Sequence, residues 1–249
     1  MMLLLFVLLS ISLPPRAEAG EIIGGHEAKP HSRPYMVYLK VYDREPYSPR
    51  RCGGFLIRKD VVLTAAHCHG STINVTLGAH NIQHKEESQQ AILIKKAIPH
   101  PNYDSRIFSN DIMLLKLVSK AKMTKNVKTL SLPGRRSRLR SGRVCSAAGW
   151  GQMAPRSKFP DKLQEVLLKV LADAECESLF GYYNKTIQIC AGDPKAEKTT
   201  FKGDSGGPLV CDNVAQGIVA YGKNNGSPPQ VFTRISSFLP WIKRTLRKM

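Results

Sequence analysis

A glycine-rich turn carries the serine of this sequence that is best suited to attack a carbonyl. Residues 203–208 read Gly-Asp-Ser-Gly-Gly-Pro, and glycine permits backbone conformations that other residues resist. Ser205 in such a turn could present its hydroxyl beside two backbone N–H groups, which would hold the resulting oxyanion. The alternative interpretation is an ordinary glycine-rich turn.

A nucleophilic serine needs a base, and the base needs an orienting group. His67 precedes Cys68, which a disulfide could fix in place. Asp111 precedes an apolar run, where a partly desolvated carboxylate requires a donor such as an imidazole N–H. The alternatives are a structural histidine, a metal site formed by His67, Cys68 and His69, and an ordinary turn aspartate. A bridged Cys68 disfavours the metal site, and no CxxC pair indicates zinc.

Short apolar runs separated by turn residues indicate the elements that must position these side chains. Such runs are typical of strands and predict an all-β fold. The first set covers residues 35–41, 55–57, 61–64, 73–78, 91–98 and 112–117, and the second covers residues 144–150, 163–171, 188–191, 208–211, 214–221 and 231–235. This bipartite layout predicts two β-barrels or sandwiches. Helices are expected only at residues 173–180 and 238–246, with Pro240 near the start of the second and a tight hairpin turn at Asp212-Asn213.

The first residues predict a secreted protein. Residues 1–13 form an apolar run that is too short to span a bilayer, and no later stretch is long and apolar enough for a membrane helix. Ala17-Glu18-Ala19 supplies a small-x-small cleavage site. Residues 1–19 are therefore interpreted as a signal peptide, which leaves Gly20-Glu21 in front of Ile22.

Secretion makes two further sequence features usable. The six cysteines of the chain are expected to pair in an oxidising compartment, although sequence alone permits 15 connectivities. Asn74 and Asn184 each begin a sequon for N-linked glycosylation.

Charge is the unusual feature of the composition. The formal net charge is +18, and removing Arg16, Glu18 and Glu21 leaves 36 basic and 17 acidic residues, or +19. This charge implies a polyanionic partner, since proteins remain soluble with far less. A solvated face is the alternative for each basic cluster taken singly. The clusters lie at residues 135–143, at Lys120, Lys122, Lys125 and Lys128, and at residues 243–248.

At four stretches the sequence resembles the chymotrypsin-like serine proteases. These are residues 22–25 (Ile-Ile-Gly-Gly), 63–68 (Leu-Thr-Ala-Ala-His-Cys), 111–115 (Asp-Ile-Met-Leu-Leu) and 203–208. They follow that family's order of His, Asp and Ser, and the resemblance runs from Ile22 to the C-terminus. It implies two packed six-stranded antiparallel β-barrels with a C-terminal helix, the barrels covering about residues 22–125 and 135–235. It also implies no cofactor, and a monomer is the default expectation.

The resemblance assigns a role to each candidate residue. Ser205 would attack and form an acyl-enzyme, His67 would take and return the proton, and Asp111 would hold the imidazole in its useful tautomer. The N–H groups of Gly203 and Ser205 would form the oxyanion hole.

An activation step is also implied by the resemblance. Gly20-Glu21 would be removed by a dipeptidyl peptidase, because a two-residue peptide ending in Glu fits such an enzyme. The new amino group of Ile22 would then form a buried ion pair with Asp204 and order the substrate pocket.

Narrower features resemble the immune-granule branch of granzymes, cathepsin G and mast cell chymases. Residues 31–36 (His-Ser-Arg-Pro-Tyr-Met) and 74–82 (Asn-Val-Thr-Leu-Gly-Ala-His-Asn-Ile) are characteristic of it, and Phe201 stands where many relatives have a pocket cysteine. The branch implies storage in secretory granules of cytotoxic lymphocytes, mast cells or neutrophils. It also implies three disulfides, which are Cys52–Cys68, Cys145–Cys211 and Cys176–Cys190.

Three positions bear on the substrate residue that precedes the cleaved bond. By the resemblance, Thr199 occupies the pocket floor where trypsin-like members carry aspartate, which disfavours cleavage after Lys or Arg. Gly222 leaves the pocket walls open to a large side chain. Gln230 matches the site where granzyme B has an arginine that binds substrate Asp, and a neutral amide cannot supply that charge-assisted bond. We therefore expect cleavage after Phe, Tyr, Leu or Met, with granzyme B-like cleavage after Asp as the alternative.

Further residues are expected around the substrate. Phe108 would shape the neighbouring subsite, and the backbone of Ala220, Tyr221 and Gly222 would pair with the substrate as an added strand. Ala220 departs from the family, because most relatives have a serine there whose hydroxyl supports the catalytic aspartate. One hydrogen bond, worth roughly 1 kcal/mol, would be lost.

Two other classes compete with an active protease. One is a heparin-binding or antimicrobial relative with little or no proteolysis, and the intact His67, Asp111 and Ser205 argue against it. The other is a secreted nucleic-acid binder, since a charge of +19 would bind DNA non-specifically. No recognisable DNA- or RNA-reading motif supports specific nucleic-acid binding. The resemblance makes a sulfated proteoglycan or heparin the expected polyanion.

Overall fold

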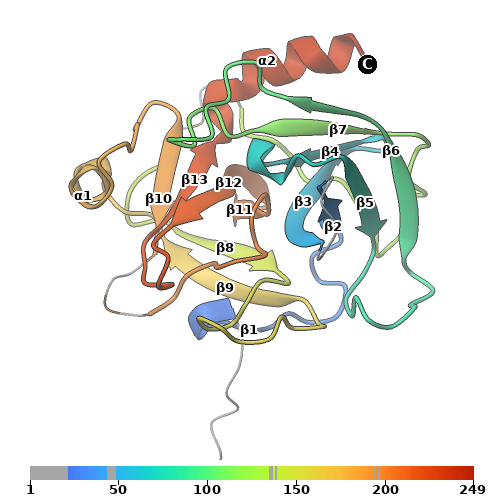
Figure 1. Cartoon of the computed structure of the whole chain (residues 1–249), viewed down its shortest axis with the longest axis horizontal. Helices are drawn as coiled ribbons and strands as arrows, with labels where there is room; N and C mark the ends of the chain where they lie inside the picture. The colour runs from blue at the N-terminus through green and yellow to red at the C-terminus, as the bar shows by residue number, and fades with distance from the viewer. Residues whose placement is uncertain (1–21, 44–48, 135–136, 138, 193–194, 196) are drawn as a thin grey trace, which may run out of the picture.

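The structure is a computed structural model that describes residues 22–43, 49–134, 137, 139–192, 195 and 197–249. Two β-sheets make up most of the fold, and Figure 1 shows them side by side with helix α2 along one edge. The predicted all-β class is confirmed. The predicted leader and dipeptide, and residues 135, 136 and 138 of the basic cluster, lie outside the described residues.

The first half is a closed antiparallel barrel of six strands, as expected from the resemblance. The barrel closes in the order β2-β3-β4-β7-β6-β5. All four residues of β4 are buried, and so are four of the five residues of β7, so both faces of these strands are covered. The strands are β2 (Met36–Tyr42), β3 (Arg50–Arg58), β4 (Val61–Thr64), β5 (Thr72–Leu77), β6 (Gln90–Pro99) and β7 (Met113–Leu117).

The second half is a seven-stranded sheet in the order β1-β9-β8-β11-β12-β13-β10. An antiparallel bridge between Val170 and Ala191 joins the end of β9 back to β10. Six of the strands therefore form a ring, and β1 lies along the start of β9 as an additional edge strand. The strands are β1 (His26–Glu27), β8 (Val144–Gly149), β9 (Gln164–Lys169), β10 (Gln188–Ala191), β11 (Pro208–Cys211), β12 (Val214–Gly222) and β13 (Gln230–Arg234).

The predicted hairpin turn is present between β11 and β12. Cys211 pairs with Val214, and Asp212 and Asn213 have φ values of 51° and 60°. Positive φ at both central residues matches the right-handed twist of the flanking strands, which is why Asn and Asp favour such turns.

Two α-helices are described, α1 (Asp173–Leu179) and α2 (Ile235–Arg247), together with short 3₁₀ turns at Ile22–Gly24 and Ala66–Cys68. Helix α2 begins three residues before the predicted start. Ile235 is fully buried on the same face as Phe238 and Leu239, and this packing extends the helix through two serines of low propensity. Pro240 therefore lies inside the helix and leaves the carbonyl of Ser236 without a helical donor.

Hydrogen bonds across the junction of the two halves hold the parts that carry the candidate residues. The backbone N–H of Gly53 in β3 donates to the carbonyl of Ser205 over 2.7 Å. The hydroxyl of Thr233 in β13 donates to the carbonyl of Asp111 over 2.8 Å. Each half thus fixes a candidate residue that belongs to the other half.

Three disulfides confirm the implied pairing of Cys52 with Cys68, Cys145 with Cys211 and Cys176 with Cys190. Among the described residues, no helix has the length and apolar character required to cross a bilayer.

Candidate active site

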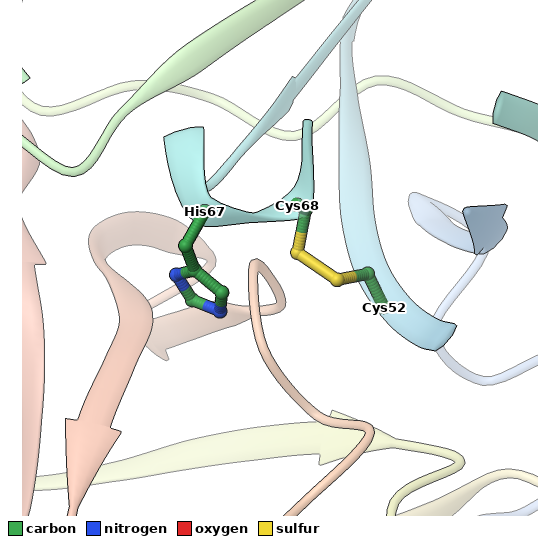
Figure 2. A group of neighbouring side chains, drawn as sticks. All are labelled: Cys52, His67 and Cys68. Atoms are coloured by element: carbon green, nitrogen blue, oxygen red, sulfur yellow. A yellow bond between two sulfur atoms is a disulfide. The ribbon is translucent and has the colours of Figure 1, made fainter. Parts of the chain in front are cut away.

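The Cys52–Cys68 disulfide fixes the position of His67. His67 lies in the 3₁₀ turn Ala66–Cys68 that follows β4, and Cys52 belongs to β3. Figure 2 shows the imidazole projecting from this turn beside the disulfide. The sulfur atoms of Cys52 and Cys68 lie near the imidazole, as a metal-binding group would require. They are joined to each other, however, and so do not provide the thiolates that a metal ion would bind.

Asp111 holds the imidazole of His67 in one tautomer. The Asp111 side chain is fully buried, and its Oδ2 lies 2.6 Å from Nδ1 of His67. Its other oxygen, Oδ1, accepts the backbone N–H of His67 over 2.9 Å. A carboxylate in this position keeps the ring proton on Nδ1, which leaves Nε2 free to accept a proton.

Ser205 lies in a loop that leaves two particular amides free. The N–H groups of Asp204, Gly206 and Gly207 donate to backbone carbonyls, whereas those of Gly203 and Ser205 make no hydrogen bond to the part of the chain that the structure describes. Gly203 has φ +103°, and a Cβ there would lie 2.9 Å from Cα of Gly151, so glycine is required. The loop therefore offers two unpaired donors to a developing oxyanion beside the serine.

His67 and Ser205 line one cavity of about 900 Å³. Of the predicted pocket residues, Phe108, Ala220, Tyr221, Gly222 and Gln230 line the same cavity. Among the described residues, no hydrogen bond joins the Ser205 hydroxyl to the His67 ring. Proton transfer between them thus requires a hydrogen bond that forms when a substrate is present.

Gln230 reaches across the cavity floor. A Cβ on Gly222 would lie 2.7 Å from Cδ of Gln230, so the missing side chain of Gly222 makes room for this amide. Thr199 is fully buried and does not line the cavity, and its hydroxyl lies 3.5 Å from Oε1 of Gln230. Gln230 therefore contributes a neutral amide to the cavity lining, with Thr199 behind it.

Aromatic rings form the wall of the cavity near His67. The Phe108 ring lies edge-on to the His67 ring at 5.6 Å and contacts the Tyr221 ring at 5.4 Å. Tyr221 also contacts Phe180 and Tyr182, at 5.6 Å and 5.1 Å. This wall offers a large apolar surface next to the base.

Ala220 provides no hydroxyl to the buried Asp111 carboxylate. Both hydrogen bonds that the carboxylate accepts from described residues come from His67. Ala220 is 5% exposed, so a serine in its place would be almost as buried.

Asp204 is a fully buried carboxylate that lacks a cation in the described structure. It accepts the N–H groups of Gly151 and Phe201 over 2.8 and 2.9 Å. Burial raises the pKa of Asp204 to about 7, and the two backbone donors only partly offset this effect. Because Glu21 precedes Ile22 in this chain, the nitrogen of Ile22 is an amide and carries no charge.

The N-terminal segment of the described chain lies beside the loop that carries Asp204. Ile22 is fully buried in the core of the second barrel, and the carbonyl of Ile23 accepts the N–H of Thr199 over 3.0 Å. A Cβ on Gly226 would contact both Ile23 and Phe201, whose own N–H binds Asp204. The described N-terminal segment therefore lies next to the stretch of chain that leads to Asp204.

The two sequon asparagines are exposed. Asn74 lies in β5, and Asn184 follows α1, where its side-chain oxygen accepts the N–H of Thr186 over 2.9 Å. Both side-chain amides are accessible to a glycosyltransferase, and occupancy remains a prediction.

Sequence reasoning missed several cavity-lining residues. Phe180, Tyr182, Lys202 and Lys223 all line the cavity. Phe180 and Tyr182 follow directly on α1, and a cluster of aromatic residues at a helix end could have indicated them. Lys202 precedes Gly203 by one residue, and its Nζ lies 5.9 Å from the centre of the Phe201 ring.

Comparison with known proteins adds to this geometry. Residues 22–242 match the trypsin family. The chain is 60% identical to granzyme B of Homo sapiens over 98% of each chain. It is 61% identical to granzyme B(G,H) of Mus musculus over 99% of each chain, and 56% identical to cathepsin G of Homo sapiens over 98% of this chain and 94% of that protein. A solved structure titled "Structure of GrC" is 53% identical and covers 91% of this chain and 100% of its own, with a TM-score of 0.88.

Proposed function

Since the chain belongs to the trypsin family of serine proteases, we propose that it is a secreted, granule-stored endopeptidase that cleaves after bulky uncharged residues. The observation that carries the catalytic part is that Ser205 and the Asp111-bound His67 line one cavity, while the N–H groups of Gly203 and Ser205 have no hydrogen-bond partner among the described residues. Ser205 attacks the carbonyl, Nε2 of His67 takes its proton, and the N–H groups of Gly203 and Ser205 hold the oxyanion. His67 gives the proton to the leaving amine as the peptide C–N bond breaks, which leaves the acyl group on Ser205. Water, deprotonated by His67, then attacks the acyl group, and the proton returns to the Ser205 oxygen as the acid is released.

The proposed preference for Phe, Tyr, Leu or Met rests on the cavity floor. An acidic substrate side chain would lose its hydration, and at Gln230 it would meet a neutral amide, with the Thr199 hydroxyl behind it, instead of a cation. The Lys202 and Lys223 side chains also line the cavity, and together with the similarity to granzyme B they favour the alternative of cleavage after Asp.

A peptide library that varies only the residue before the cleaved bond distinguishes these preferences. The chain beginning at Ile22 should have a kcat/KM for Phe, Tyr, Leu or Met at least tenfold above that for Asp. Gln230→Arg supplies the missing cation and should reverse this order. A preference of the unaltered chain for Asp would overturn the proposal.

Labelling with a serine-directed fluorophosphonate distinguishes a protease from an inactive relative that acts through charge alone. The chain beginning at Ile22 should be labelled, and Ser205→Ala should not. An unlabelled chain that still kills bacteria would favour the antimicrobial alternative.

Activation is proposed to depend on removal of Gly20-Glu21 by a dipeptidyl peptidase. The cleavage would convert the amide nitrogen of Ile22 into an ammonium group close to the buried Asp204. A buried carboxylate with a raised pKa is stabilised in its charged form by such a cation. This proposal explains why a fully buried acid lies in the loop whose N–H groups would hold the oxyanion.

A sulfated proteoglycan or heparin is the proposed storage partner. The β3–β4 turn joins two of the basic clusters, because the N–H of Ala121 donates to the carbonyl of Lys59 and the Arg58 guanidinium donates to the carbonyl of Leu246. The segment that carries Lys120 and Lys122 and the basic end of α2 are thus both next to this turn. The exposed basic residues of these segments are Lys59, Lys120, Lys122, Lys243, Arg244, Arg247 and Lys248.

Elution from immobilised heparin tests the proposed surface. Replacing Lys120 and Lys122 by Gln should lower the salt concentration at elution more than replacing the exposed Lys158 and Lys169, which removes the same charge elsewhere. Equal shifts for the two pairs would mean that only net charge matters.

A further inference from the structure

Gln188 is a buried glutamine that does not line the cavity but binds two residues of its wall. It begins β10 and is 2% exposed. The Tyr221 hydroxyl donates to Oε1 of Gln188 over 3.2 Å, and Nε2 of Gln188 donates to the carbonyl of Phe108 over 3.5 Å. The backbone N–H of Asn184 also donates to Oε1, over 2.8 Å, so both lone pairs of this oxygen are used.

Tyr221 is the centre of the aromatic wall, and Gln188 is the described hydrogen-bond partner of its hydroxyl. Its ring contacts the rings of Phe108, Phe180 and Tyr182. Tyr221 is 7% exposed, so without Gln188 its hydroxyl would be left nearly buried and unpaired. The ring would then have to rotate or shift toward water, and the wall would change with it.

Phe108 depends on Gln188 in a different way. Its φ of +50° is uncommon for a residue with a side chain, and Asn110 nearby has φ +56°. Phe108 lies in the segment between β6 and β7 of the first barrel, whereas Gln188 belongs to the second barrel. The bond from Gln188 therefore connects the two halves across the wall, next to the imidazole of His67.

We propose that Gln188 is a positioning residue that sets the aromatic wall for substrate side chains preceding the residue at the cleaved bond. The inference rests on the proposed protease function, because the wall continues from the cavity that His67 and Ser205 line. The wall is large and apolar, so the side chains that it would accept are large and apolar as well. Gln188 itself touches neither substrate nor reacting atoms.

Substrates of two lengths separate this role from a general structural one. Gln188→Met keeps the volume and removes both the donor and the acceptor. For a tetrapeptide substrate with apolar residues before the cleaved position, kcat/KM should fall about tenfold through KM, the factor expected for losing one buried hydrogen bond. For an ester that carries a single amino acid, kcat/KM should change less than twofold.

A double-mutant cycle tests the route through Tyr221. Tyr221→Phe removes the hydroxyl alone. If Gln188 acts through that hydroxyl, the fall in kcat/KM for the tetrapeptide in the double variant should be no greater than the larger of the two falls in the single variants. Gln164→Met is the matched control, because Gln164 is another buried strand glutamine, 4% exposed and hydrogen-bonded to the carbonyl of Lys162, and it does not line the cavity. Gln164→Met should lower kcat/KM equally for the two substrates or leave both values unchanged.

Three results would overturn the proposal. They are an equal loss for both substrates, no loss for the tetrapeptide, or additive losses in the cycle. If Gln188→Met does not fold, Tyr221→Phe still carries the test with the same two substrates.

Failure of the protease function itself would appear as absence of Ser205-dependent hydrolysis of either substrate. In that case, the fluorine NMR signal of fluorotyrosine at position 221 should still shift in Gln188→Met, and an unchanged signal would reject the role of Gln188.

Discussion

The free energy of unfolding should depend on pH differently before and after removal of Gly20-Glu21. In the uncleaved chain, burial raises the pKa of Asp204 from its ordinary 3.8 to about 7, so the folded state binds a proton that the unfolded state releases. The contribution of Asp204 to the free energy of unfolding is then greatest near pH 4 and falls as the pH rises to 7. Each pH unit in this window is worth about 1.4 kcal/mol, so the fall amounts to about 4 kcal/mol.

Cleavage should remove this fall. An ammonium group on Ile22 favours the charged carboxylate, which holds the pKa of Asp204 low and leaves little difference between the folded and unfolded states above pH 4. The cleaved chain should instead lose stability and activity at alkaline pH, when the amino group releases its proton and the carboxylate is again unpaired.

Urea unfolding at pH 4, 5, 6 and 7 measures this difference directly. The chain beginning at Gly20 and the chain beginning at Ile22 are compared, since apart from Asp204 they differ only in Glu21 and in the residue that carries the α-amino group. Asp204→Asn should abolish the extra fall in the longer chain, and the exposed Asp161→Asn should leave it unchanged. Identical pH profiles for the two unaltered chains would refute the assignment of Asp204 to the Ile22 amino group.

Two further predictions concern the cavity. Ala220→Ser is expected to give the Asp111 carboxylate a third donor. Steady-state kinetics should then show kcat raised about fivefold with KM unchanged, which corresponds to roughly 1 kcal/mol of added stabilisation of the transition state. An unchanged kcat would show that the two hydrogen bonds from His67 suffice. Gly222→Ala places a Cβ against the Gln230 side chain, so kcat/KM should fall at least tenfold for Phe substrates and less than threefold for Ala substrates. Equal losses would show that position 222 affects more than cavity width.

Sequence patterns predicted the parts of the fold that depend on local chemistry. The strand Val61–Thr64 has its predicted limits because its apolar residues are uninterrupted and its ends are marked by charged or small residues. The predicted helix start at Phe238 was wrong by three residues, since the helix begins at Ile235, where burial against the core outweighed the low propensity of two serines. Closure of the second ring by Val170 and Ala191 joins residues 21 positions apart, and no local pattern reports such a contact.

The candidate site divides in the same way. His67, Asp111 and Ser205 lie in motifs that can be recognised from sequence, and the structure places His67 against Asp111 as expected. Gln188 could not be found in this way, because a glutamine in an apolar strand gives no indication of the hydroxyl that it binds. Thr199 shows that a motif position does not fix where a side chain lies. The resemblance assigned Thr199 to the pocket floor, but its side chain lies behind Gln230.

Hydrogen bonds between the two barrels position the candidate site residues more directly than the contacts within each barrel do. The carbonyl of Ser205 is held by Gly53, that of Asp111 by Thr233 and that of Phe108 by Gln188, and in each pair the two residues belong to different halves. The larger buried core takes in side chains of both halves and the second half has a further core of its own, so loss of one such bond costs little of the total stability. It would nevertheless move a nucleophile, an orienting carboxylate or a subsite relative to the others, and catalysis depends on their relative placement within fractions of an ångström. Variants at this junction should therefore lose activity well before they lose the fold.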